Sequence, residues 1–187
     1  MDTIFRKMQT NYSLTDRDIK YLKFSFTALL YDISKMLILF LFFFAIGETA
    51  AFLLDMALLI LLRCNHGGLH TKHYLSCFLL SFSILLFAIC IMPALPKSVV
   101  TAVLSLCILI NYLVGPIRSK QCQVQDDRIF HRNQRNTFLI VFIFLIATCL
   151  LPSSHLMISG FWVIVAQSAQ LIIAKYLQTH TQKEAIS

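Results

Sequence analysis

The sequence predicts an all-α protein that crosses a membrane about six times. Of its 187 residues, 58% are hydrophobic, whereas soluble domains usually have roughly 45–50%, and the mean hydropathy is +0.74. The apolar residues recur in blocks along the whole chain, and charged residues near the N-terminus interrupt any signal-peptide pattern. We therefore expect a single membrane-embedded domain over residues 1–187, with a transmembrane bundle at residues 24–177.

The N-terminal segment, residues 1–23, is predicted to form amphipathic helices that lie in the membrane interface. Four apolar side chains fall on one helical face: Ile4, Phe5, Met8 and Tyr12. Ser13 and Thr15 are each followed three positions later by an aspartate, which is the spacing of a capping box and predicts a second helix start. A membrane anchor and a docking surface for an amphipathic partner both fit this segment.

Six apolar segments follow as predicted transmembrane helices. They cover residues 24–46, 49–62, 75–92, 98–114, 137–151 and 156–176. The breaks between them are Gly47-Glu48, the polar stretch 63–74, Pro93 to Lys97, Gly115-Pro116 with the polar connection 117–136, and residues 152–155. The first segment carries Asp32 and Lys35 three positions apart, where opposite charges on one helix face can pair. The second segment is shorter than the roughly 20 residues that cross a bilayer, so the polar stretch after it is expected within the membrane boundary.

Lys and Arg residues are distributed unevenly between the connections. Fourteen lie before the first span, in the polar stretch, in the connection 117–136 or at the C-terminal end, whereas Lys97 is the only one in the other three connections. Because cytoplasmic loops retain positive charge, both termini, the tail at 178–187 and the polar stretch are expected to face the cytoplasm. This orientation accounts for the net charge of +7, and no soluble basic domain is predicted that would bind nucleic acid.

The reactive side chains are concentrated in residues 63–77, which read RCNHGGLHTKHYLSC. A thiol becomes nucleophilic when a nearby imidazolium lowers its pKa, so Cys77 with one of the histidines is a candidate catalytic pair. On a continuous helix His73 is the i, i+4 neighbour of Cys77, whereas His70 reaches Cys77 only from a loop that precedes the helix. Local geometry alone favours His73, whereas a helix that begins only after Lys72 or His73 would leave His70 in a loop able to fold back over Cys77. His66 is expected to be a polar loop residue at the membrane surface.

The same stretch is a weaker candidate for a metal site than for a catalytic cysteine–histidine pair. Its possible ligands are Cys64, His66, His70, His73 and Cys77. No acidic residue lies between Asp55 and Asp126, which removes the carboxylate that zinc proteases use as general base. We therefore expect no metal and no cofactor. A metal-binding membrane protein, or a transporter whose pathway the stretch lines, remains the alternative to an enzyme.

The arrangement Arg63, Gly67-Gly68-x-His70 and Cys77, within six apolar segments and a basic N-terminus, resembles the accessory gene regulator B (AgrB) family. These are membrane cysteine endopeptidases that process bacterial quorum-sensing propeptides. The resemblance implies a catalytic dyad in which Cys77 is the nucleophile and His70 the base. It also implies functional roles for Arg63 and Gly68. As a mechanistic hypothesis, backbone N–H groups around Gly67-Gly68 stabilise the oxyanion, and Arg63 binds a carboxylate of the substrate tail bidentately.

The resemblance further implies the reaction and the partners. The expected substrate is a small AgrD-like propeptide with an amphipathic leader and an acidic C-terminal tail. The enzyme would remove the tail and transfer the acyl group to an internal thiol or hydroxyl, which gives a thiolactone or lactone ring. The expected setting is the bacterial cell membrane, with the protein as a homodimer.

Overall fold

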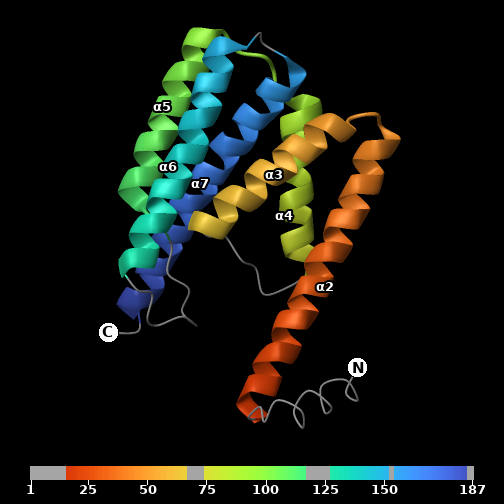
Figure 1. The fold of residues 1–187 in the computed structure, drawn as a ribbon, viewed down its shortest axis with the longest axis vertical. Coiled ribbons are helices and arrows are strands. Elements are labelled where there is room, and N and C mark those ends of the chain that lie inside the picture. The colour runs from red at the N-terminus through yellow and green to blue at the C-terminus, as the bar shows by residue number, and fades with distance from the viewer. Residues whose placement is uncertain (1–15, 67–73, 117–126, 152–153, 185–187) are drawn as a thin grey trace. The chain divides into compact units, whose positions relative to one another are not determined.

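The structure is a computed structural model that describes residues 16–66, 74–116, 127–151 and 154–184. Every regular element in these ranges is a helix, which confirms the predicted fold class (Figure 1). The elements are α2 (Asp16–Ala45), α3 (Thr49–His66), α4 (Tyr74–Leu86), the π-helix η1 (Phe87–Ile91), α5 (Lys97–Val114), α6 (Asp127–Leu150) and α7 (His155–Glu184). The chain divides into two compact units, residues 1–46 and 47–187. The prediction of a single domain stays a prediction.

The first unit contains the long helix α2, which holds the first predicted span. The Lys35 ammonium donates to Asp32 Oδ1 at 3.0 Å, so the pairing predicted from their i, i+3 spacing is confirmed. Residues 16–23, predicted to lie in the membrane interface, are the first turns of this same helix. The remainder of the predicted interfacial segment, residues 1–15, lies outside the described residues.

The second unit accounts for the other predicted spans. Within the described ranges, five helical segments are long and apolar enough to cross a bilayer: α3, α4 with η1, α5, α6 and α7. Many of their apolar side chains point outward, including Leu113 at 72% and Ile143 at 64% exposure. Such surfaces are stable in lipid and not in water. The protein is therefore a multi-pass membrane protein.

Three helices run further than the hydropathy pattern predicts. α3 continues four residues past the predicted end and takes in Arg63 and His66. α6 begins at Asp127, inside the predicted connection 117–136, and α7 continues into the predicted tail. Hydropathy marks the membrane boundary, whereas a helix ends where its backbone hydrogen bonds end, and polar side chains do not interrupt those bonds.

Helix α7 is the centre of the second unit. It packs against α3, α5, η1 and, less extensively, α4, while α5 also packs on α6 and α3 on α6. Figure 1 shows α5 alongside α6 and α7, with α3 crossing them. The core residues of α7 are Phe161, Val163, Ile164, Leu171 and Ala174. Because α7 contacts more of these helices than any other element of the described unit, it provides the frame against which they are placed.

Gly160 allows α3, α6 and α7 to approach one another closely. A Cβ atom built on Gly160 would lie 2.8 Å from the Phe144 ring of α6 and 3.1 Å from Leu58 Cδ1 of α3. One residue earlier, Ser159 Oγ donates to Asp55 Oδ1 at 3.2 Å, and both side chains are fully buried. Asp55 thus lies in a helix contact between α3 and α7.

Candidate active site

The structure describes part of the predicted site. Arg63 lies in the last turn of α3 and Cys77 in the first turn of α4. His70, Gly67, Gly68 and the competing His73 fall within residues 67–73, outside the described residues. In the sequence, these residues follow α3, which carries Arg63, and precede α4, which carries Cys77.

The Cys77 thiol is half-buried and is not part of a disulfide. The described part of α4 starts at Tyr74 and carries Cys77 in its first turn. The i, i+4 argument for His73 requires a continuous helix through both residues; His73 lies outside the described residues, so the choice between His70 and His73 stays a prediction. Cys64, the other thiol of the stretch, is exposed on α3.

The Arg63 side chain reaches into the bundle. Nη1 donates to Ser81 Oγ of α4 at 3.3 Å, and Nη2 donates to Gln170 Oε1 of α7 at 3.3 Å. Ser81 and Gln170 are both buried. Arg63 therefore links α3 to two other helices, one of which carries Cys77.

His66 differs from the expectation of a polar loop residue at the membrane surface. It is the last residue of α3 and is 2% exposed, with its ring against Asn111 of α5. Asn111 Nδ2 in turn donates to Ser168 Oγ of α7 at 2.9 Å. The side chain faces inward because α3 continues to His66 and the helical turn directs that position toward α5 and α7. His66 belongs to the helix packing and not to the surface around Cys77.

The polar start of α6 lies against the same end of α3. Asn136 Nδ2 donates to Asn65 Oδ1 at 3.2 Å. The exposed cationic side chains before it lie at helical spacing on one face: Arg128, Arg132 and Arg135. The end of the second unit that carries Arg63 is therefore strongly basic.

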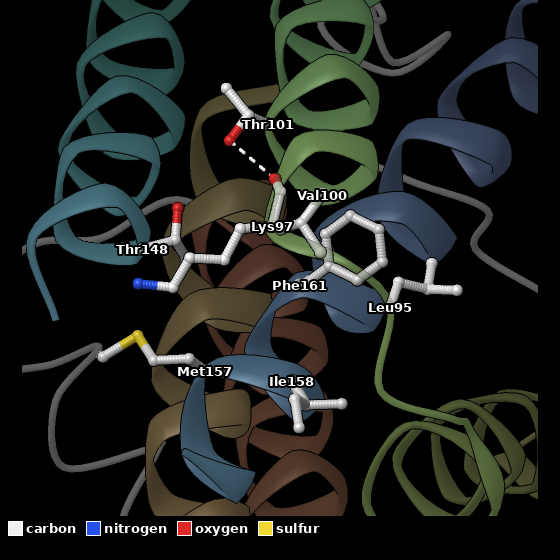
Figure 2. A pocket seen from close by; sticks show the side chains of 8 residues that line it. All are labelled: Leu95, Lys97, Val100, Thr101, Thr148, Met157, Ile158 and Phe161. Atoms are coloured by element: carbon white, nitrogen blue, oxygen red, sulfur yellow. Dashed lines mark hydrogen bonds between the residues drawn. The ribbon is translucent and has the colours of Figure 1, made fainter. Parts of the chain in front are cut away.

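A pocket lies between α5, the end of α6 and the start of α7 (Figure 2). Figure 2 labels its lining residues, which are Leu95, Lys97, Val100, Thr101, Thr148, Met157, Ile158 and Phe161. The lining is mainly apolar, and the Lys97 ammonium donates to the Leu151 carbonyl at 3.0 Å, at the C-terminal end of α6. Phe161 precedes Gln170 by nine residues, or roughly 14 Å along α7. This pocket is therefore separate from the junction that Arg63 forms with Ser81 and Gln170.

Sequence reasoning missed Ser81 and Gln170. Both lie in apolar runs that predict membrane spans, where a single polar residue is a weak signal. A polar side chain in a span normally has a partner on another helix, and that rule could have marked them, although not their partner. Among the described residues, no group of three or more His, Cys, Asp or Glu side chains is placed to hold a metal ion.

The chain resembles known proteins over most of its length. The family described as Accessory gene regulator B matches residues 1–171. An AgrB-like protein of Clostridium beijerinckii is 29% identical over 121 residues, which cover 63% of this chain and 61% of that protein. The match thus spans about three fifths of that relative's length. No solved structure matches the chain.

Proposed function

Because the chain belongs to the accessory gene regulator B family, and so acts in that quorum-sensing system, we propose that it is a membrane cysteine endopeptidase that also closes a ring. Its substrate is a small AgrD-like propeptide with an amphipathic leader and an acidic C-terminal tail. The enzyme removes the tail and joins the new acyl end to an internal thiol or hydroxyl. The product is a thiolactone or lactone peptide.

The half-buried Cys77 thiol at the start of α4 is the observation that carries this proposal. It lies one helical turn before Ser81, which is hydrogen-bonded to Arg63. A nucleophile must be reachable by the substrate and held in a defined position. A thiol at the first turn of a helix, beside a polar junction of three helices, meets both requirements.

His70 is the base of the proposed dyad. It takes the thiol proton as Cys77 Sγ attacks the scissile carbonyl carbon, and a tetrahedral oxyanion forms. Backbone N–H groups of Gly67 and Gly68 donate to that oxyanion. The C–N bond then breaks, His70 returns the proton to the leaving amine, and the N-terminal fragment stays on Cys77 as a thioester.

Ring closure uses the same thioester. The substrate thiolate attacks the acyl carbon, the new C–S bond forms, and the bond to Cys77 breaks to release its thiolate. Exchange between two thioesters is nearly neutral in free energy, so proximity decides the outcome. A thiol on the bound fragment reacts with an effective molarity of about 10⁵ M or more when well oriented, which favours the ring over hydrolysis.

The basic end of the second unit supports an acidic substrate on the cytoplasmic side. Arg128, Arg132 and Arg135 are exposed on one face of α6, next to the Asn136–Asn65 contact with α3. Positive side chains are retained in the cytoplasm, so we place this end, the catalytic segment and both termini there. We also propose that the enzyme is a homodimer in the bacterial cell membrane.

The first prediction tests the dyad by co-expression of each variant with a candidate propeptide, followed by mass spectrometry of the cleaved fragments. We expect Cys77→Ala and His70→Ala to abolish cleavage, because each removes one partner of the proton transfer. His73→Ala and Cys64→Ser are the matched controls and should retain most of it. If His73→Ala were inactive and His70→Ala active, the base would be His73 and the proposed dyad would be wrong.

A further inference from the structure

The guanidinium of Arg63 is the meeting point of three helices in the second unit. Nη1 donates to Ser81 Oγ and Nη2 to Gln170 Oε1, each at 3.3 Å. These residues lie on α3, α4 and α7. Hydrogen bonds from a charged donor are stronger than those between neutral groups, and more so where water is excluded. This junction therefore helps to set the position of α4 relative to α3 and α7.

Helix α4 has few buried side chains over its own length, and the packing of this span on α7 lies mainly beyond it, in η1. Between Tyr74 and Leu86 only Ser81 and Leu85 are buried, while Leu75 and Leu79 are 68% and 56% exposed. Apolar side chains that face lipid do not resist rotation of a helix about its own axis. The hydrogen bond at Ser81 therefore helps to hold the end of this span that carries Cys77, whereas η1 holds the other end against α7.

Cys77 moves with Ser81. The two residues are four positions apart, so they lie on one face of α4 and are separated by about 6 Å along its axis. A rotation or shift of α4 that breaks the bond at Ser81 displaces the Cys77 thiol by a similar amount. A displacement of about 1 Å from the productive geometry is enough to slow a reaction by roughly 10²-fold.

Gln170 anchors the junction to the frame of the bundle. It is 5% exposed on α7, the helix that packs against α3, α5, η1 and α4. Its Oε1 accepts from Arg63, whereas its Nε2 has no hydrogen-bond partner among the described residues. Burial of an unpaired donor is unfavourable. The favourable contribution of Gln170 to this junction is therefore the hydrogen bond that its Oε1 accepts from Arg63.

We propose that Gln170 is a positioning residue for the Cys77 thiol. It fixes Arg63, Arg63 fixes Ser81, and Ser81 sets the orientation of the helix that carries Cys77. Both Nη atoms of Arg63 donate within the bundle, which suits a link between helices. This inference rests on the proposed function only in taking Cys77 as the nucleophile.

The test uses the full chain in detergent, with the five cysteines other than Cys77 replaced by alanine. The rate of Cys77 alkylation by N-ethylmaleimide reports the position of the thiol without any substrate. We expect Gln170→Met, which keeps the size but removes the acceptor, to raise this rate severalfold and to slow propeptide processing about tenfold. Gln170→Glu keeps an acceptor for Arg63 and should remain within about twofold of the parent in both assays.

Serine variants provide a second test of the same hydrogen bonds and its matched controls. Ser81→Ala removes the α4 end of the junction and should behave like Gln170→Met, which also covers the case in which Gln170→Met fails to fold. Ser168→Ala removes a buried hydrogen bond between α5 and α7, and Ser83→Ala alters a half-buried position on α4. Both should stay close to the parent in both assays.

The outcomes separate the two proposals. Parent-like alkylation in Gln170→Met and Ser81→Ala would refute the positioning role, as would equal impairment of Gln170→Met and Gln170→Glu, which would indicate packing alone. A changed alkylation rate in Gln170→Met, restored in Gln170→Glu, supports the positioning role even if the parent processes no propeptide. In that last case the proposed function fails while the link from Gln170 to Cys77 stands.

Discussion

Gly160→Ala tests the close approach of α3, α6 and α7. The added Cβ atom would lie 2.8 Å from Phe144 Cε2 and Cζ and 3.1 Å from Leu58 Cδ1. Because carbon atoms normally pack at about 3.5–4.0 Å, the Phe144 ring must move by about 1 Å. That ring is nearly fully buried, so the movement disturbs the packing around it.

The expected free-energy change combines two opposing effects. Overpacking of a core costs about 1–3 kcal/mol, while replacing glycine by alanine inside a helix gains about 1 kcal/mol. The net loss is then up to about 2 kcal/mol. For a chain of this size, 1 kcal/mol corresponds to roughly 2–4 °C, so the thermal midpoint in detergent should fall by up to about 8 °C.

A second variant isolates the cause. Phe144→Leu removes the ring that the new Cβ would meet, and the remaining contact is with the flexible end of Leu58. In that background Gly160→Ala should raise the midpoint, because only the helix-propensity gain remains. Midpoints can be read from the loss of monodisperse protein on size exclusion after heating. A destabilisation by Gly160→Ala of equal size in both backgrounds would refute the proposed contact with Phe144.

Two further predictions concern the buried hydrogen bond between Asn111 and Ser168 and the orientation of the protein in the membrane. Asn111→Leu removes the bond to Ser168, but interhelical hydrogen bonds in membranes average only about 0.6 kcal/mol, so the thermal midpoint should fall by no more than a few degrees; a collapse of the fold would contradict this. In a cysteine-free background, cysteines at Ser119 and Gln134 should react with an impermeant reagent only from the cytoplasmic side, and a cysteine at Ser154 only from outside. Labelling of position 119 by the impermeant reagent in intact cells would show that the orientation is the reverse of the predicted one.

Local patterns in the sequence predicted the parts of the fold that depend on neighbouring residues. The apolar blocks marked the spans, and the spacing of Asp32 and Lys35 predicted an ion pair that the structure contains at 3.0 Å. The exact helix ends were not predictable in this way. The residues from Asp127 to Asn136 are mostly polar and predict a connection, although their backbone is helical.

The contacts that organise the site depend on residues far apart in the chain. Arg63 and Gln170 are separated by 107 positions, and nothing near either residue indicates the other. His66 likewise reads as part of a polar stretch, yet the turn of α3 directs it into the bundle against Asn111. The catalytic residues proposed from motif spacing stay a prediction, whereas the contacts of Arg63 follow from the packing of α3, α4 and α7.

The central claim, that Cys77 carries the substrate as a thioester, is tested most directly by the intact mass of the enzyme. The substrate for this test is a propeptide whose ring-forming cysteine is replaced by alanine, so that cleavage proceeds without an acceptor for the second step. We predict an adduct with the mass of the N-terminal fragment, which hydroxylamine removes and which Cys77→Ala does not form. The parent propeptide should leave little adduct, because its own thiol completes the exchange. Release of a free linear acid with no adduct, or failure to cleave the alanine propeptide at all, would contradict the account.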